Sequence, residues 1–202
     1  MIVIIDYGLG NTNSVKKAFY RIGIDSQISN DKNAIQRAEK LVLPGVGHFG
    51  VGMKNLKESG FLDQINDLVL KKKIPILGIC LGMQLMTKHS EEANISGFDW
   101  IDAEVKNFKF SDNNLKIPHM GWNNLSLNKE DGIFKELSNK DMFYFVHSYY
   151  TICNCKSDIT SSTEYGNYFV SSFQKDNIFG VQFHPEKSHD QGLRLLKNFA
   201  ML

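Results

Sequence analysis

A cysteine stands at the joint between an apolar run and a predicted helix start in residues 76–84, ILGICLGMQ. Gly78 and Gly82 flank Cys80 in the Gly-x-Cys-x-Gly pattern of a nucleophile elbow. Such a turn presents the thiol above a sheet edge, at a helix start that favours its thiolate form. The N–H group of Leu81 would point to where an oxyanion forms. The pattern predicts a nucleophile, although a small buried cysteine in a glycine-rich packing turn has the same sequence.

A candidate base for this thiol lies in residues 179–188, FGVQFHPEKS. His184 ends an apolar strand, and Pro185 blocks further pairing because it lacks an N–H group. In an extended backbone the side chains of His184 and Glu186 point to the same side of the strand. Glu186 can then accept from one imidazole nitrogen while the other faces the thiol. We therefore predict the nucleophile–base–orienter set of acyl-transfer enzymes, rather than a strand-end histidine beside a solvent-exposed glutamate.

A glycine-rich loop, residues 43–50 (LPGVGHFG), is the candidate source of a second oxyanion donor. Gly45 and Gly47 permit backbone conformations that other residues avoid. A peptide N–H from Gly45, Val46 or Gly47 could turn towards the thiol, and a flip of this loop would make the oxyanion hole switchable. A plain Pro-Gly turn is the alternative. Residues 7–11, YGLGN, lack a full phosphate-loop fingerprint, so nucleotide binding is not predicted.

The other histidines have no carboxylate at strand spacing on their own side, which makes them weaker candidates for the base. His119 and His147 are predicted to be structural or binding residues, and the rest fall in loops or at helix ends: His48, His89 and His189. Cys153 and Cys155 have no matching second pair. We therefore expect neither a metal site nor a cofactor.

The first half of the chain must position these residues, and it alternates apolar runs with helical patterns. Strands are predicted at 2–6, 40–44 (stopped by Pro44) and 74–79. Helices are predicted around Val15, Ala18, Phe19 and Ile22, and over 56–73 with a possible break at Gly60. Strands that are apolar throughout predict a mostly parallel sheet with helices on both faces, the flavodoxin-like α/β class.

The second half contains strand-like segments separated by turn residues, at 100–110, 116–127, 142–152, 161–166, 168–174 and 178–185. These predict antiparallel strands added to the parallel core. Residues 190–202 predict a closing amphipathic helix. No repeat or linker divides the sequence, so we expect one domain over 1–202.

Composition limits the classes of function. The chain has 202 residues, with 42% hydrophobic and 22% charged residues and a formal net charge of +1. This balance is that of a globular domain with no general attraction to nucleic acid or anionic membrane. No apolar run approaches membrane-spanning length, and three poorly spaced cysteines favour a reducing cytoplasm.

Taken together, GICLGMQ, LPGVG, PHMGWN, FVHSYY and GVQFHPEKS resemble the class I (triad) glutamine amidotransferases. Within them, the sequence is similar to the HisH family, the glutaminase subunits of imidazole glycerol phosphate synthase. The resemblance runs from IVIIDYGLGN to LRLLKNF, essentially the whole chain. It implies a glutaminase that releases ammonia into a passage to a HisF-like barrel partner of histidine biosynthesis, as a heterodimer.

The resemblance also implies roles for individual residues. Cys80 would attack glutamine, His184 would act as base and then acid, and Glu186 would orient His184. Leu81 and the segment Pro44 to Gly47 would form the oxyanion hole, after a flip triggered by substrate on the partner. Further positions match the family's substrate-binding residues, Gln84, Ser148 and Tyr149, and its partner-facing residues, Asn11, Trp122, Tyr144 and Lys187.

Two segments resemble a related set of glutaminases more than the histidine-pathway members. Residues 100–103, WIDA, stand where those members tend to carry a glycine-containing turn, and HPEKSHDQG contains His189. The related glutaminases pair with N-sugar amidotransferases of surface-polysaccharide synthesis. A non-catalytic regulatory module on the same fold, and a stand-alone cysteine hydrolase of another amide, are the remaining alternatives.

Overall fold

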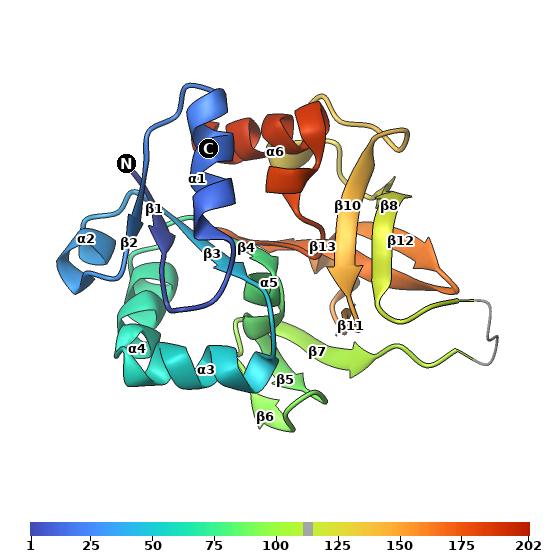
Figure 1. Cartoon of the computed structure of the whole chain (residues 1–202), viewed down its shortest axis with the longest axis horizontal. Helices are drawn as coiled ribbons and strands as arrows, with labels where there is room; N and C mark the ends of the chain where they lie inside the picture. Colours follow the sequence, from blue (N-terminus) through green and yellow to red (C-terminus); the bar gives the residue numbers. More distant parts are fainter. Residues whose placement is uncertain (111–114) are drawn as a thin grey trace.

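The computed structural model describes residues 1–110 and 115–202, and its centre is a twelve-stranded mixed sheet (Figure 1). One half of this sheet is parallel, in the order β2-β1-β3-β4-β14. This is the strand order of flavodoxin-like doubly wound folds, so the predicted fold class is confirmed. The strands are β1 (Ile2–Ile5), β2 (Ser26–Ser29), β3 (Lys40–Gly45), β4 (Ile76–Cys80) and β14 (Ile178–Val181).

Helices cover both faces of the parallel half, as the apolar strands require. Figure 1 shows α1 and α6 on one side and α3 and α4 on the other. In the first strand, Ile2 and Ile4 join one apolar core while Val3 and Ile5 join the other. The helices are α1 (Thr12–Arg21), α2 (Lys32–Gln36), α3 (Phe49–Glu58), α4 (Phe61–Asn66), α5 (Leu81–Leu85) and α6 (His189–Met201), with a π-helical turn at Asp67–Lys71.

The second half adds antiparallel strands beyond β14, as predicted. Strands β13, β11 and β7 continue the sheet, and β10 pairs with β8 in a separate two-stranded sheet. These strands are β5 (Thr87–Ser90), β6 (Ile95–Ser96), β7 (Ile101–Asn107), β8 (His119–Asn124), β9 (Ser126–Leu127), β10 (Met142–His147), β11 (Tyr149–Cys153), β12 (Ile159–Tyr165) and β13 (Asn167–Lys175). Short 3₁₀ turns lie at Gly132–Phe134, Lys156–Asp158 and Pro185–Lys187.

Several sequence-based boundaries were wrong. The segment predicted at 142–152, for example, is divided into β10 and β11. Strand β3 continues through Pro44, whose partner is Ile79, to Gly45. The predicted helix at 56–73 breaks at Gly60, which has a φ of +68°, but its first part begins much earlier, at Phe49. Two contacts hold that start: His48 Nδ1 accepts from the Gly50 N–H at 3.1 Å, and the distant Glu92 carboxylate accepts from the Phe49 N–H at 2.6 Å.

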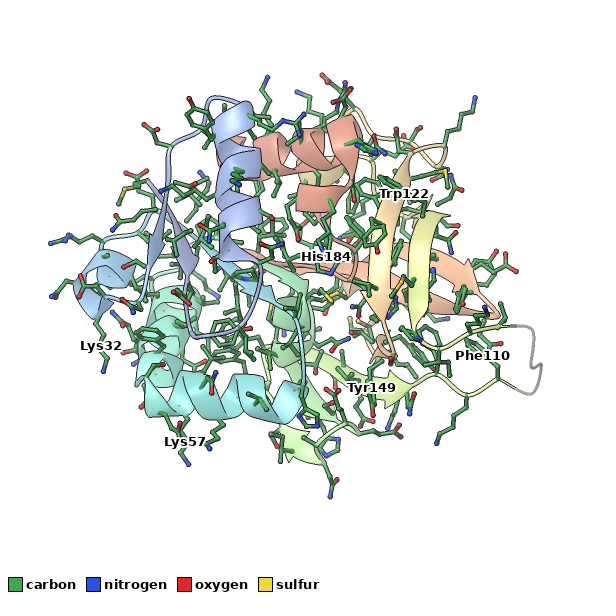
Figure 2. All side chains as sticks on the ribbon, in the orientation of Figure 1. Lys32, Lys57, Phe110, Trp122, Tyr149 and His184 are labelled. Atoms are coloured by element: carbon green, nitrogen blue, oxygen red, sulfur yellow. The ribbon has the colours of Figure 1, made fainter. Side chains whose placement is uncertain are left out.

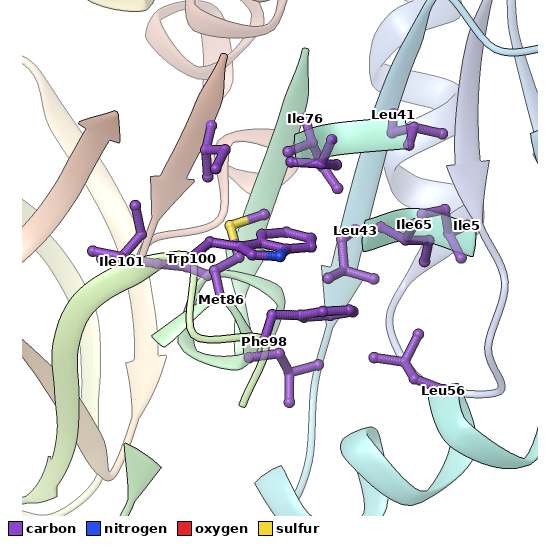
Figure 3. Packing of buried hydrophobic residues seen from close by; sticks show 14 of the residues in the cluster. Ile5, Leu41, Leu43, Leu56, Ile65, Ile76, Met86, Phe98, Trp100 and Ile101 are labelled. Atoms are coloured by element: carbon purple, nitrogen blue, oxygen red, sulfur yellow. The ribbon is translucent and has the colours of Figure 1, made fainter. Parts of the chain in front are cut away.

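The unusual WIDA segment is part of the apolar core rather than a surface turn. Trp100 is buried, stacks on Phe98 with ring centroids 4.2 Å apart, and donates to Asn66 Oδ1 at 2.6 Å. Figure 3 shows both rings among aliphatic side chains from the neighbouring strands and helices. The tryptophan therefore fills the core below the sheet and fixes the start of β7.

No helix in the described part of the chain is long and apolar enough to cross a membrane.

Candidate active site

Cys80 lies at a strained strand-to-helix turn. It is the last residue of β4, pairs with Gly45 of β3, and has φ 53° and ψ −109°. A Cβ at Gly78 would lie 2.7 Å from the Met83 backbone nitrogen, and one at Gly82 would overlap the Leu43 carbonyl oxygen. Both flanking glycines are therefore required for the close approach of the turn to its own sheet, as in a nucleophile elbow.

The helix after the turn is short. Helix α5 has five residues, and the chain then enters β5 at Thr87. A helix this short carries a weaker dipole than a full one, so the expected dipole effect on the thiol is smaller. Leu81 is its first residue, and its N–H belongs to the first turn, which has no acceptor within the helix. An N–H at this position is the donor that the predicted oxyanion hole requires.

His184 and Glu186 meet as expected, but through a different backbone. Strand β14 ends at Val181, and the residues after His184 form the 3₁₀ turn Pro185–Lys187 instead of an extended strand. The turn still brings His184 Nδ1 to 2.8 Å from Glu186 Oε1, with both side chains almost fully buried. His184 Nε2 has no hydrogen-bond partner among residues 1–110 and 115–202. This nitrogen is therefore available to the thiol.

The charge state of His184 depends on Cys80. Burial alone lowers the pKa of His184, but the negative charge of a Cys80 thiolate and the hydrogen bond to Glu186 raise it, and the net result is a pKa of about 10. The thiolate and the imidazolium thus stabilise each other in a buried site. Figure 2 shows His184 near the centre of the molecule, between α6 and the sheet.

A pocket of about 300 Å³ opens over Cys80. Its lining includes most of the residues predicted for the nucleophile, the oxyanion hole and substrate binding, but not His184, Glu186 or Gly45, and it includes further residues that the sequence did not assign to the site. The predicted members are Val46, Gly47, Cys80, Leu81, Gln84, Ser148 and Tyr149, and the others are Glu92, Pro118, Val146 and His147. The volume suits a molecule of amino-acid size.

The oxyanion segment lies at the edge of this pocket. Gly45 is buried against the elbow, and a Cβ there would lie 2.7 Å from both the Leu81 Cβ and the Tyr7 hydroxyl oxygen. Val46 and Gly47 are exposed, and Gly47 has a φ of +112°, which favours glycine. The fixed end and the exposed end of the segment therefore differ in their freedom to move.

Two polar residues at the site were missed by the sequence analysis, Glu92 and Gln182. Glu92 lines the pocket opposite the start of α3. Gln182 is completely buried, and its Nε2 lies 3.6 Å from Cys80 Sγ while its Oε1 lies 2.9 Å from Gln84 Nε2. Gln182 is two residues before His184 in the same motif. That spacing was the one local signal that could have revealed it.

His119 and His147 form a buried pair beside the pocket. His119 Nδ1 lies 3.1 Å from His147 Nε2, and His147 Nδ1 lies 2.8 Å from the Tyr149 carbonyl oxygen. Burial lowers the pKa of His119 to about 4. Burial also lowers the pKa of His147 to about 3, and the Tyr149 hydrogen bond only partly opposes this. Both rings are therefore neutral near pH 7, which fits a structural role.

Three of the predicted partner-facing residues share one surface. The Trp122 and Tyr144 rings are 6.0 Å apart, and Lys187 Nζ lies 5.7 Å from the Tyr144 ring centre. His189 extends the cluster, because its ring stacks on Trp122 at 4.7 Å with an angle of 8°. Asn11 is at the start of α1, where its side chain accepts from Ser14 N at 3.3 Å. We call the set Trp122, Tyr144, Lys187 and His189 the aromatic–basic face.

Comparison with known proteins gives one consistent result. The glutamine amidotransferase class-I family matches residues 3–202. Imidazole glycerol phosphate synthase subunit HisH 2 of Methanococcus maripaludis is 52% identical over 199 residues, 98% of each chain. The corresponding HisH 1 of Campylobacter jejuni is 52% identical over 204 residues, and HisH 2 of Pseudomonas aeruginosa is 45% identical over 202, each covering 100% of both chains.

Solved structures show the same fold at low sequence identity. A glutamine amidotransferase of Thermotoga maritima has a TM-score of 0.64 at 20% identity, covering 99% of this chain and 82% of its own. PurLQS of Thermotoga maritima has a TM-score of 0.75 at 15% identity, covering 99% and 97%.

Proposed function

Because the chain belongs to the class-I glutamine amidotransferases, and within them to the HisH family, we propose that it is the glutaminase subunit of an imidazole glycerol phosphate synthase. It hydrolyses glutamine to glutamate and ammonia. The observation that carries this proposal is local: a cysteine at a strained elbow below a pocket, next to a buried His184–Glu186 pair at 2.8 Å.

The chemistry follows from these three side chains. The Cys80 thiolate attacks the side-chain amide carbon of glutamine, and the C–N bond breaks as His184 Nε2 gives its proton to the leaving nitrogen. Ammonia and a thioester result. His184 then removes a proton from water, which attacks the thioester and releases glutamate and the thiolate. Glu186 accepts from Nδ1 throughout, which fixes the ring and stabilises its positive charge.

The pocket offers acceptors for the ammonium group of an amino acid. Both N–H groups of the Gln84 amide are used, by the Tyr149 carbonyl oxygen at 3.0 Å and by Gln182 at 2.9 Å. The side-chain carbonyl oxygen of Gln84 therefore remains to accept a hydrogen bond from the substrate. The Glu92 carboxylate adds a negative charge to the same pocket. Ser148 and Tyr149 line it as the remaining substrate-binding positions.

Oxyanion stabilisation comes from Leu81 N–H and from the segment Gly45 to Gly47. Val46 and Gly47 are exposed, which supports a rearrangement of this segment when the acceptor of ammonia binds to the partner. Such gating limits wasteful release of ammonia, which would be protonated and lost in water near pH 7.

The partner that we propose is a HisF-like barrel, bound as a heterodimer through the aromatic–basic face and Asn11. A large, rigid aromatic surface with a cation at its edge is typical of the anchors of protein interfaces. The acceptor, a phosphoribulosyl intermediate of histidine biosynthesis, binds to that partner. A role in amino-acid biosynthesis supports a cytoplasmic location for the complex.

One observation favours a second candidate for the molecule that receives the ammonia. The names of three of the relatives carry a number, HisH 1 or HisH 2, which distinguishes more than one such protein in an organism. A paralogous glutaminase that serves an N-sugar amidotransferase of surface-polysaccharide synthesis would keep the same catalytic residues. Affinity purification of the chain from its own cells separates the two, because the synthase that co-purifies identifies the acceptor.

Replacement of the nucleophile tests the proposed activity. We expect Cys80→Ala to reduce glutamine hydrolysis at least about a thousandfold, in the presence of the partner synthase and its acceptor, because no other group can form the thioester. Glutamate release is the measurement. Cys155→Ala, at an exposed cysteine, is the matched control and should retain the activity of the unaltered protein.

Two results would remove the proposal. If a folded Cys80→Ala variant still hydrolysed glutamine, Cys80 would be excluded as the nucleophile. Absence of ammonia release by the unaltered complex with either acceptor would instead favour a non-catalytic regulatory module.

A further inference from the structure

We propose that Gln182 is a further catalytic residue, whose side-chain N–H donates to Cys80 Sγ and stabilises the thiolate. This rests on the proposed role of Cys80 as the nucleophile. The Gln182 Nε2 to Sγ distance is 3.6 Å, and the side chain is completely buried. A primary amide is costly to bury unless its polar atoms are bonded. This one bonds on one end to the nucleophile and on the other to Gln84.

Hydrogen bonding determines which end of the Gln182 amide faces the sulfur. The Tyr149 carbonyl oxygen can only accept, so the Gln84 atom 3.0 Å away must be its nitrogen. The second N–H of that nitrogen points to Gln182 at 2.9 Å, so Gln182 must present its oxygen there. Its nitrogen then faces Cys80. The opposite orientation would set two N–H groups against each other in a buried site.

The Tyr149 carbonyl oxygen, with which this series of hydrogen bonds begins, is itself held in place. The Tyr149 carbonyl oxygen also accepts from His147 Nδ1 at 2.8 Å, so the other nitrogen of His147 is an acceptor and receives the His119 Nδ1–H at 3.1 Å. His119 Nε2 then accepts from Asn123 Nδ2 at 3.4 Å. A continuous run of hydrogen bonds therefore holds the amides of Gln84 and Gln182 in one orientation.

Gln182 and His184 act on the sulfur in different ways. His184 exchanges a proton with the reacting groups, so its own charge changes during the reaction. Gln182 is a neutral donor that neither gains nor loses a proton. It stabilises negative charge on sulfur both before attack on glutamine and when the thioester releases the thiolate. The two residues are two positions apart in the chain.

Alkylation of Cys80 by iodoacetamide in the partner-free protein tests this role, with mass spectrometry of the Cys80 peptide as the readout across a range of pH. Gln182→Met keeps the length and approximate volume of the side chain but removes the donor. We expect its alkylation rate near neutral pH to fall about tenfold, the effect of one charge-assisted hydrogen bond, and the rate–pH curve to move up by about one unit. At high pH the two proteins should react at the same rate.

The high-pH limit distinguishes thiolate stabilisation from a change of shape. A misplaced or less accessible thiol would react more slowly at every pH. The control is Gln174→Met, the same substitution outside the site, on the neighbouring strand β13. Its alkylation rate should depend on pH as that of the unaltered protein does. A folded Gln182→Met variant with an unshifted curve, or with a rate lowered equally at all pH values, would overturn the proposal.

Gln84→Met provides a second route if Gln182→Met does not fold. It removes the partner that orients Gln182, so we expect a smaller shift of the alkylation curve in the same direction, and an unshifted curve would count against the proposal. The measurement needs neither glutamine nor a partner. Failure of the proposed function and failure of this inference are therefore distinguishable.

Discussion

His184 shows how buried groups set each other's charge. Its ring is held by Glu186 at 2.8 Å and faces a thiolate, so it is charged although burial opposes charge. His119 and His147, a short distance away, have no carboxylate and stay neutral. Three buried histidines thus have two charge states, and the difference follows from the partner of each ring.

The neutral pair predicts a loss of stability in acid. In the unfolded chain a histidine has a pKa of about 6.5, whereas burial lowers the pKa of His147 to about 3 in the folded protein. Between these values the unfolded chain binds the extra proton. The contribution of the pair is therefore complete above about pH 6.5 and is lost as the pH falls, towards about 4 for His119 and about 3 for His147, by up to about 1.4 kcal/mol per pH unit for His147.

Urea unfolding across this pH range is the measurement for that prediction. His147→Gln should make the decline of the unfolding free energy with falling pH shallower, because one titrating group is gone. His48→Gln, at the exposed cap of α3, is the control. An equally steep decline in the His147 variant would show that other groups cause the acid sensitivity.

Single residues were predictable from the sequence where their pattern was local. Cys80 has its two glycines, and His184 and Glu186 share one motif. Glu92 and Gln182 became visible only with the fold, because Gln182 is 102 positions from the thiol that it contacts. Gln84 was assigned to the substrate alone, whereas its amide nitrogen is fully used by protein acceptors.

The elbow between β4 and α5 depends on close contact with β3. Gly82 lies against the Leu43 carbonyl oxygen, with no room for a Cβ. We expect Gly82→Ala to destabilise the protein by about 3 kcal/mol or more, because backbone on both sides must move. The midpoint of thermal unfolding is the measurement.

Gly52→Ala, in α3, is the comparison for that prediction. A Cβ there would meet the ends of the Leu85 side chain at 3.2 Å and of the Leu81 side chain at 3.6 Å. Such side-chain ends can rotate away, so the effect should be much smaller. Equal midpoints for the two variants would show that the elbow tolerates a greater separation between residue 82 and β3 than the structure has.

Strands were easier to predict than helix boundaries. Strands β1, β3 and β4 are buried on both faces and read as continuous apolar runs, which identified them to within two residues. The parallel edge strand β2 is partly exposed and has no such run, and it was not predicted. The start of α3 was misplaced and the length of α5 was not predicted, because contacts outside the local pattern help to set both. Glu92 helps to fix the start of α3, and β5 leaves only five residues for α5.

The site and the aromatic–basic face are linked through one turn of the molecule. The turn Pro185–Lys187 joins them, because Glu186 points inward to His184 while Lys187 lies over Tyr144 outside. The fold could be predicted from alternating elements and from the resemblance. The packing of His189 on Trp122 could not, because it needs a positive φ at a histidine that starts α6.

The aromatic–basic face predicts the site of partner binding. We expect Trp122→Ala to weaken binding of the HisF-type synthase from the same genome by about 30-fold or more, the usual effect of a central interface tryptophan. Calorimetric titration gives the dissociation constant. Tyr168→Ala, at a 66% exposed ring on β13, is the control. Unchanged affinity in the Trp122 variant would place the partner on another surface.

Covalent trapping of the nucleophile tests the central claim most directly. The complex with partner and acceptor is incubated with a diazoketone analogue of glutamine, which alkylates the thiolate that attacks it, and the labelled peptide is identified by mass spectrometry. The account predicts one adduct, on Cys80, that excess glutamine suppresses and that Glu186→Ala greatly slows. Labelling at Cys153 or Cys155 instead, or Cys80 labelling that glutamine does not suppress, would contradict it.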